Sequence, residues 1–505
     1  MNACTRNGTW ATARLSDIAH VIRGRVKPQD HPDLPFVGMD NVEPHTMRLL
    51  GTVPSSTMKS ASVHFRPGDV LYGRLRPYLN KVLAPDFEGL ASAEFIPLTT
   101  PDGVLPTFLQ YRLNAADFVT YASHLDEGDR PRVDYDQIGA FEFKLPPSGE
   151  QHRIVEAIKS YFTRLDDAVA TLERVQRNLK RYRASVLKAA VEGRLVPTEA
   201  ELARAEGRDY EPASVLLTRI LAERRRRWEE AELAKMKARG KTPKNDKWKA
   251  KYKEPVAPDT SDLPDLPEGW CWASLPQLGE LNRGKSKHRP RNDPRLFGGP
   301  YPFIQTGDVR HSGGFITKYS STYNEFGREQ SRLWPSGTLC ITIAANIAET
   351  GILNFDACFP DSVVGFLCKG DPTRVRFVEL FLRTAKQELA RYAPATAQKN
   401  INLEVLSAVA VPLPPRAEQA RIVSEADRLL SVGSSGEESA KLNTLRISRL
   451  RQSILKWAFE GRLVDQDPND EPASVLLERI RAEREAAAAT KPKRPKRRKA
   501  RSKKT

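Results

Sequence analysis

The chain has 505 residues and a mass of 56.6 kDa, and its 80 Lys and Arg against 63 Asp and Glu give a net charge of +17. Hydrophobic residues make up 40% of it, which excludes a wholly disordered protein, and no apolar run reaches the roughly 18 residues that cross a bilayer. The five cysteines show no metal-ligand or disulfide spacing, and the first residues do not resemble a secretory signal. We therefore expect a cytoplasmic protein of about three domains with an anionic partner.

Residues 1–147 are predicted to form a first block of mixed α/β structure. The run Phe141–Leu145 predicts a strand and Leu105–Leu113 a helix. Cations alternate with aromatic rings in this block, and this pattern suits contact with nucleic acid. Its candidate DNA-binding residues are Tyr72, Arg74, Arg76, Tyr78, Lys81, Arg130 and Arg132.

Residues 148–230 are predicted to form a helical region. From Ile154 to Val186 the apolar residues follow one another at steps of three and four, the spacing of a coiled-coil seam. About 37 such residues at 1.5 Å each give a rod of roughly 55 Å. Gly193 suits the C-terminal end of that helix. A single amphipathic rod is not stable alone, so it needs a partner.

Residues 231–265 are rich in Lys and Pro and are predicted to be a linker, followed by a second mixed α/β block at 266–415. Leu339–Ile343 predicts a strand and Val375–Leu389 a helix. Asn and Gln side chains pair with adenine and Arg with guanine, so both kinds are candidates here. The candidate DNA-binding residues are Lys285, Lys287, Arg289, Gln305, Arg310, Asn346, Gln398, Lys399 and Asn400.

The helical region recurs at 416–488, and this repeat is the strongest signal in the chain. The offset is 268 residues at first and then falls to 260. The repeated motifs are Leu-Pro-Pro-x-x-Glu-Gln-x-Arg-Ile-Val at 145–155 and 413–423, Glu-Gly-Arg-Leu-Val at 192–196 and 460–464, and Glu-Pro-Ala-Ser-Val-Leu-Leu at 211–217 and 471–477. Residues 489–505, with no acid after 490 and ten Lys and Arg, are predicted to be a disordered basic tail.

The two helical regions are expected to pack antiparallel as a coiled coil, with the blocks at opposite ends and an internal pseudo-two-fold axis. The second copy keeps apolar residues such as Ile422, Leu442 and Ile454, but Gly433–Gly436 predicts a kink or break in its helix. The alternative is two helices buried in separate domains, because a 3–4 spacing also suits ordinary bundles.

Two motifs imitate catalytic sites. Residues 279–286 fit the spacing of a phosphate-binding loop, but the proline-containing residues after them cannot start the helix that such a loop needs. Asp134 or Asp136 with Glu142 and Lys144 imitates a metal-dependent nuclease, yet the corresponding stretch of the second copy carries no charges. We predict neither catalytic nor metal-binding residues.

With two unlike blocks and these three duplicated motifs, the chain resembles the specificity (S) subunit of type I restriction–modification systems. The resemblance implies an α+β fold in which each block is a target recognition domain for one half of a split DNA site. At about 3.4 Å per base pair, a rod of ~55 Å separates the two readers by on the order of 10–16 base pairs.

The resemblance also implies a protein that is not an enzyme and binds no cofactor itself. Two modification subunits carry S-adenosylmethionine and methylate adenine, and restriction subunits use ATP and Mg²⁺. The subunits are implied to dock on the repeated motifs, at Glu192, Gly193, Arg194, Leu195, Glu211, Pro212, Leu216, Glu460, Gly461, Arg462, Leu463, Glu471, Pro472 and Leu476.

Three alternatives stay open from the sequence. The chain is a specificity-like module of another defence system or of a system with a methyltransferase alone, or a coiled-coil interaction protein without sequence readout, or a self-sufficient nuclease. Co-purifying subunits, DNA selection at moderate salt and plasmid cleavage with Mg²⁺ separate them.

Overall fold

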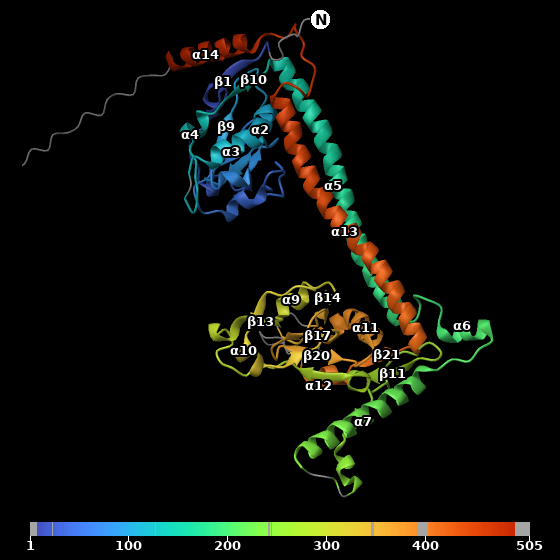
Figure 1. The fold of residues 1–505 in the computed structure, drawn as a ribbon. Coiled ribbons are helices and arrows are strands. Elements are labelled where there is room, and N and C mark those ends of the chain that lie inside the picture. The colour runs from blue at the N-terminus through green and yellow to red at the C-terminus, as the bar shows by residue number, and fades with distance from the viewer. Residues whose placement is uncertain are drawn as a thin grey trace, which may run out of the picture. The chain divides into compact units, whose positions relative to one another are not determined.

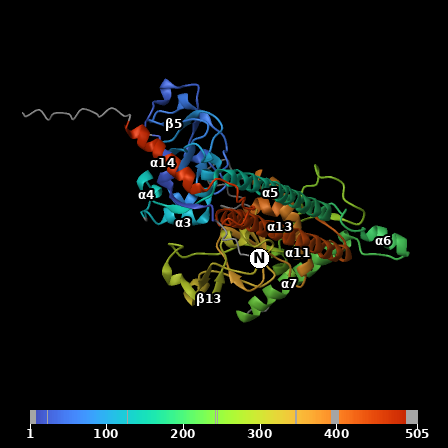
Figure 2. The same cartoon turned by 90° about the horizontal axis from the view of Figure 1, so that it is seen from above.

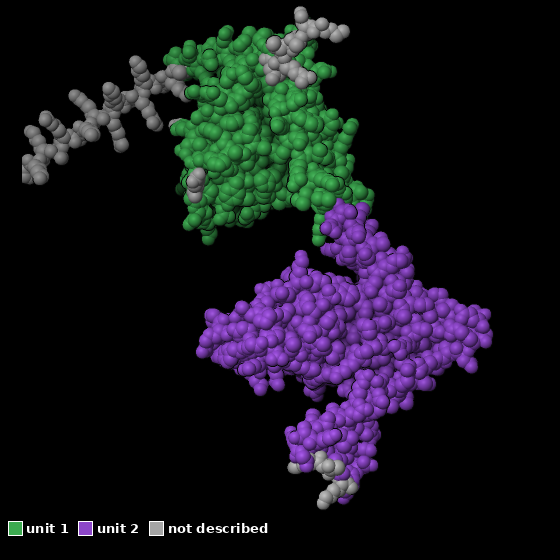
Figure 3. Space-filling view, viewed as in Figure 1, with its two compact units in different colours: residues 1–174, 440–505 green, residues 175–439 purple. Residues whose placement is uncertain are grey.

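The computed structural model describes residues 8–489 except 23, 127, 241–242, 244, 345–347 and 392–401. The chain divides into two compact units, residues 1–174 with 440–505 (unit 1) and residues 175–439 (unit 2), coloured green and purple in Figure 3. Each unit therefore combines one block with parts of both repeats. The predicted Asn346, Gln398, Lys399 and Asn400 and the basic tail lie outside the described residues.

Unit 1 builds its block from short strands in three sheets, ordered β1-β10, β2-β9-β6-β7 and β4-β3-β8-β5 (Figure 1). The strands are β1 (Ala11–Arg14), β2 (His20–Val21), β3 (Pro35–Val37), β4 (Val53–Pro54), β5 (Val63–Phe65), β6 (Val70–Gly73), β7 (Val82–Leu83), β8 (Gly89–Ala91), β9 (Phe95–Thr99) and β10 (Glu142–Leu145). The helices are α1 (Leu15–Ile18), α2 (Pro106–Asn114), α3 (Ala116–Ser123), α4 (Tyr135–Gly139) and α14 (Ala473–Ala489).

Unit 2 repeats this plan with sheets ordered β11-β21, β12-β20-β17-β18-β14 and β15-β13-β19-β16. Its strands are β11 (Cys271–Ser274), β12 (Glu280–Arg283), β13 (Phe297–Phe303), β14 (Phe315–Ile316), β15 (Ser321–Tyr323), β16 (Leu333–Trp334), β17 (Leu339–Thr342), β18 (Thr350–Leu353), β19 (Ala357–Cys358), β20 (Val363–Leu367) and β21 (Ala410–Leu413). Its helices are α6 (Glu199–Glu206), α7 (Ala213–Ala238), α8 (Leu275–Leu278), α9 (Thr306–Arg310), α10 (Glu325–Glu329), α11 (Pro372–Arg391) and α12 (Leu403–Ala408).

The two long helices are α5 (Ser148–Val191) and α13 (Arg416–Phe459), and each has 44 residues. Both views draw them side by side (Figures 1 and 2). In unit 1 the early residue Asp166 of α5 pairs with the late residue Arg451 of α13. In unit 2, Arg183 pairs at 2.9 Å with Glu437, so a later residue of α5 meets an earlier residue of α13 than in the Asp166–Arg451 pair. Both pairs fit antiparallel helices, so the predicted fold class is confirmed.

Both cores join a block to one end of each long helix. In unit 1, Phe108 and Phe118 of the block pack in one cluster with Ile154 of α5 and Ile454 of α13. In unit 2, Phe377 belongs to the cluster that also contains Ala190 of α5 and Ile422 of α13. Burial of these side chains, at roughly 1.5–3 kcal/mol for each large one, fixes each block to the helices.

The predicted seam is correct in part. Ile154, Ile158 and Val186 are buried, as a seam requires, and so is Ile454 in the second copy. Leu442 and Leu450 of α13 are instead about half exposed, at 48% and 49%. A pair of helices covers only one face of each, and these residues lie outside the covered face. A run of apolar residues at steps of three and four does not by itself distinguish the covered face from an open one.

The predicted break at Gly433–Gly436 is wrong, because α13 continues through it as one helix. A Cβ on Gly436 would lie 3.2 Å from Leu179 Cδ1 of α5. Arg183 of α5 donates a hydrogen bond to Ser434 Oγ at 2.8 Å. The small residues therefore allow the two helices to approach closely, and this contact offsets the low helix propensity of glycine.

Replacing Gly433 with alanine should stabilise unit 2 by about 0.5–1 kcal/mol, because alanine loses less backbone entropy in a helix. A Cβ on Gly433 would meet its nearest neighbours, Arg183 and Tyr182, only at 3.6–3.8 Å, which is ordinary contact. The measurement is the melting temperature of the full chain. The matched variant Gly436→Val places a branched side chain against Leu179 and should lower that temperature. If Gly433→Ala also lowers the melting temperature, the two helices have no room for an added methyl group, and the prediction is wrong.

The predicted linker 231–265 begins with a helix and a folded turn. The helix α7 extends to Ala238, and residues Asp246–Lys251 form a 3₁₀ turn whose Trp248 is buried. Lys and Pro dominate the composition of this segment and predicted a linker, whereas its Trp248 stacks on Trp228 of the preceding helix and folds the segment.

Candidate nucleic-acid interface

Two loops of the first block meet and expose cations together. The Arg76 amide donates to Pro131 O at 2.8 Å, and the Val133 amide donates to Arg74 O at 3.1 Å. This backbone pairing places the exposed side chains of Arg76, Arg130 and Arg132 on adjoining segments. Arg132 also pairs with Glu94 at 2.6 Å. The loops present cations from separate parts of the sequence, as a phosphate-binding surface requires.

The turn that carries Tyr78 is held in an uncommon backbone conformation. Arg76 and Asn80 both have positive φ values, 53° and 47°, although neither is glycine. Asn80 is buried, and its Nδ2 donates to Asn114 O at 3.2 Å. The turn leaves the Tyr78 ring 47% exposed. Tertiary contacts thus keep an aromatic ring and a cation together at the surface.

Two of the predicted DNA-binding residues of the first block are buried, so that role is wrong for them. Tyr72 is 1% exposed in β6, its ring meets Phe118 edge-on, and burial raises the pKa of its phenol. Lys81 is 8% exposed and donates from Nζ to Met39 O at 2.6 Å. Arg74 is half-buried. Alternation of cations and rings does not reveal which side chains point inward.

In the second block the predicted cations are exposed after β12. Lys285, Lys287 and Arg289 are exposed, and Arg289 donates from Nη1 to Ser286 O at 2.7 Å. The neighbouring Arg291 pairs with Asp361 at 2.8 Å. Three cations therefore remain on one loop for an anionic ligand.

Of the other two described candidates of this block, Gln305 precedes α9 and Arg310 is the last residue of that helix. Both side chains are exposed. The Gln305 amide donates to Asp308 Oδ2 at 2.8 Å, which closes the first turn of α9. The Gln305 side chain is thereby held at the N-terminal end of the helix, where it can contact a ligand.

A buried Trp–Glu pair anchors each block to its long helix. Trp10 Nε1 donates to Glu150 Oε2 at 2.7 Å, and Trp270 Nε1 donates to Glu418 Oε1 at 3.0 Å. Both carboxyl groups are fully buried, and burial raises the pKa of each. The sequence held the signal for this pairing, because the Trp recurs at an offset of 260 residues and the Glu at an offset of 268.

A second duplicated contact was missed in the sequence. In unit 1, Arg484 of α14 donates to Ser16 O of α1 at 2.7 Å. In unit 2, Arg224 of α7 donates to Pro276 O of α8 and to Gly279 O, the latter at 2.6 Å. Donor and acceptor are both related by the offset of 260. This arginine holds the last repeated helix against the first helix of each block.

The predicted docking residues fall into two groups. Glu192 and Arg194 pair with each other, as do Glu460 and Arg462. Glu211 and Glu471 pair with an arginine eight residues later in the following helix. These side chains are exposed or partly exposed. Gly193 and Gly461 have φ values of 68° and 69°, and they end α5 and α13 as predicted from the motif.

Leu216 and Leu476 are not available for docking, because each is 2% exposed. Leu476 packs in the core of unit 1, and Leu216 is buried in α7 of unit 2. Leu195 and Leu463 are partly buried and pack against the clusters of their units, whereas Pro212 and Pro472 precede α7 and α14. The repeated leucines at 216 and 476 therefore hold elements together inside the chain.

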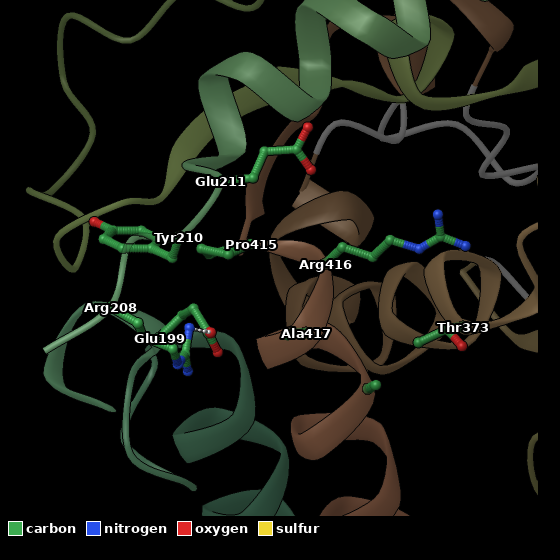
Figure 4. Close-up of a pocket in the computed structure, with 9 residues that line it drawn as sticks. Glu199, Arg208, Tyr210, Glu211, Thr373, Pro415, Arg416 and Ala417 are labelled. Carbon is green, nitrogen blue, oxygen red and sulfur yellow. Dashed lines mark ion pairs between the residues drawn. The ribbon is translucent and has the colours of Figure 1, made fainter. Parts of the chain in front are cut away.

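Unit 2 also contains a surface pocket of about 500 Å³ (Figure 4). Its lining includes Glu199, Arg208, Tyr210 and Glu211 on one side and Thr373 and Arg416 on the other. Glu199 is already paired with Arg208 at 2.7 Å and with Arg421 at 2.6 Å. These pairs satisfy the charge of the most deeply buried group in the lining.

Neither catalytic look-alike has the structure that its chemistry needs. Within 279–286, residues Glu280–Arg283 form the strand β12, and no helix follows it. Glu142 pairs with Arg14 at 3.0 Å, and Lys144 donates to Thr12 Oγ1 at 2.9 Å. Among the described residues there is no group of three or more metal-ligating side chains and no helix long and apolar enough to span a membrane.

Comparison with known proteins gives one consistent result. Residues 267–444 match the type I restriction modification DNA specificity domain. The EcoDI specificity subunit of Escherichia coli is 26% identical over 223 residues, covering 43% of this chain and 49% of that subunit. The EcoBI specificity subunit of Escherichia coli is 26% identical over 369 residues, covering 70% and 66%. The chain thus spans about half to two thirds of the length of these relatives.

A solved structure described as the structural basis of complex assembly and conformational transition of the type I R-M system has the same fold. Its TM-score is 0.59 at 19% identity, and the match covers 90% of this chain and 98% of that one. Residues 267–444 thus match a DNA specificity domain, and the duplicated Trp–Glu anchors show that the chain contains an internal repeat. The chain is therefore similar, over the parts that match, to the specificity subunits of type I restriction enzymes.

Proposed function

We propose that this chain selects the DNA site for a type I restriction–modification complex and catalyses no step itself. Each block reads one half of a bipartite duplex site. Two adenine methyltransferase subunits, and through them the restriction subunits, dock on the repeated helices. S-adenosylmethionine, ATP and Mg²⁺ are then bound by those partner subunits and not by this chain.

One observation carries the proposal. The two blocks differ in sequence, but each is attached to its long helix by the same contacts. Strand β1 pairs with β10 and β11 with β21 in the same register, with Ala11 opposite Leu145 and Cys271 opposite Leu413. The Trp–Glu pair recurs beside each of these two-stranded sheets. A duplicated attachment with different loops suits two readers that recognise different sequences on one ligand.

Exposed apolar residues on the repeated helices support the docking of other subunits. Val215 of α7 and Val475 of α14 are equivalent positions and are 53% and 41% exposed. Leu445 and Trp457 of α13 are 60% and 49% exposed. Large exposed apolar side chains on both repeats fit protein partners that bind twice.

Exchange of one block should change one half of the methylated motif and leave the other unaltered. The variant replaces residues 270–412 with the equivalent block of another specificity subunit. Adenine methylation is mapped across the genome of a host that expresses the chain with its methyltransferase subunits. The expected result follows because base contacts come from the block, whereas the repeats only hold it.

The matched control exchanges residues 10–144 and should change the opposite half. A motif altered in both halves by a single exchange would contradict two independent readers. Methylation without any motif would favour an interaction protein without sequence readout, and cleavage of plasmid by the purified chain with Mg²⁺ alone would favour a nuclease.

A further inference from the structure

A charged projection follows the first repeat, and we call residues 224–240 together with 245–254 the basic arm. It consists of the second half of α7 and the segment that returns along it (Figure 1). The helix α7 has 26 residues, whereas its repeat partner α14 has 17 described residues. Among the described residues of the second repeat, the basic arm has no counterpart.

Aromatic stacking folds the basic arm into a defined shape. The rings of Trp228 and Trp248 stack with centroids 6.0 Å apart, and Tyr252 lies 5.2 Å from Trp228. Arg225 lies over the Tyr252 ring at 5.8 Å and pairs with Glu254 at 3.4 Å. These contacts, at about 0.5–1.5 kcal/mol for an aromatic pair, hold the returning segment against the helix.

The basic arm carries cations that its own acids do not neutralise. Each of its described acids from Glu229 to Glu254 forms an ion pair with a cation of the arm: Glu229 with Arg225 and Lys249, Glu230 with Arg226, Glu232 with Lys235, Asp246 with Lys249, and Glu254 with Arg225. Five further cations are exposed and have no ion pair with any described residue. They are Lys237, Arg239, Lys247, Lys251 and Lys253.

We propose that the basic arm binds the phosphate backbone of duplex DNA without reading its sequence. This inference rests on the proposed function, since the blocks bring the duplex to the same chain and raise its effective concentration at the arm. Duplex phosphates fit better than single-stranded bases, because the Trp228 ring already stacks on Trp248 and packs against Tyr252, so these rings are engaged with one another. Five unpaired cations on a folded support suit a repeating row of phosphates.

The test measures DNA binding by the full chain, purified with its methyltransferase subunits, across about 50–200 mM salt. The variant replaces Lys237, Arg239, Lys247, Lys251 and Lys253 with glutamine. The slope of log affinity against log salt should fall by about 2–4.5 units for a motif-free duplex, since each lost phosphate contact removes about 0.9. Affinity at about 100 mM salt should fall at least tenfold. The affinity ratio between motif and motif-free duplex should not change.

A matched control removes five exposed cations from the long helices, at Lys180, Arg181, Lys441, Arg446 and Arg449. Equal losses in both variants would mean that affinity follows net charge alone, and this would overturn the proposal. Unchanged DNA binding with weaker assembly of the methyltransferase subunits would also overturn it, because the arm would then bind protein. If the unaltered chain shows no preference for its motif, the proposed function fails, whatever the arm variant does.

Discussion

Replacing Glu379 with alanine should lower the free energy of unfolding of unit 2 by about 3 kcal/mol, because it removes the fully buried one of the two carboxylates that pair with the buried Arg376. Glu379 is fully buried in α11, where it pairs with Arg376 and accepts a hydrogen bond from Thr350 Oγ1 at 3.1 Å. Burial raises the pKa of Glu379, while Arg376 and Arg383 oppose that rise. The measurements are thermal melting of the full chain and hydrogen exchange in α11.

The same substitution should weaken readout of the half-site that the second block recognises. Arg376 also pairs with Asp427 of α13 at 2.6 Å, so it joins the block to the long helix. The matched variant Glu379→Gln keeps the shape and an acceptor for Thr350 and should lose less stability. A loss below about 1 kcal/mol for the alanine variant would mean that the pair adds little beyond the cost of burying it.

Replacing Gly284 with alanine should destabilise the second block by about 2–4 kcal/mol, since a Cβ there overlaps rigid backbone. That atom would lie 2.3 Å from Pro360 O and 2.4 Å from Phe359 O. The Gly284 amide donates to Val363 O at 2.8 Å, so the backbone cannot move away without losing this bond. The measurement is the melting temperature together with retention of the exposed loop at Lys285 in a protease assay.

The matched control is Gly307→Ala, because no atom lies within 4 Å of a Cβ at Gly307 of α9. This substitution should change the free energy of unfolding by no more than about 0.5 kcal/mol. Equal effects of the two substitutions would contradict the steric argument. Gly284 is one of the two glycines that gave residues 279–286 the spacing of a phosphate-binding loop, and close backbone packing accounts for it.

The sequence was sufficient for the architecture because the duplication is recorded in identical residues. The offset of 268 relates both ends of α5 to those of α13, so the repeat alone predicted two matching helices. The antiparallel pairing followed from the need of each rod for a partner. Glu150 and Glu418 are related by the same offset and Trp10 and Trp270 by the offset of 260, although the contact between Trp and Glu became visible only in the fold.

The surface could not be predicted to the same degree. Tyr72 and Lys81 fit the sequence pattern of a nucleic-acid site, but both side chains are buried. Tyr72 lies in the buried strand β6, and Lys81 donates a hydrogen bond to Met39 O. The stretch around Gly433 and Gly436 predicted a break, because local propensity does not include the neighbouring helix. Residues that depend on distant contacts were therefore the ones that local patterns misplaced.

Unit 1 consists of two segments of the chain and unit 2 of one, and this difference determines which unit can finish folding first during synthesis. Unit 2 is continuous, residues 175–439, whereas unit 1 needs residues from both ends of the chain. The Ala473 amide donates to Thr9 O at 2.9 Å, and Leu455 and Leu476 fill the core around the first block. The first block leaves the ribosome early. Its apolar surface then stays exposed until the C-terminal helices that cover it have been synthesised. Premature termination near the C-terminus would therefore damage the half of the protein that was translated first.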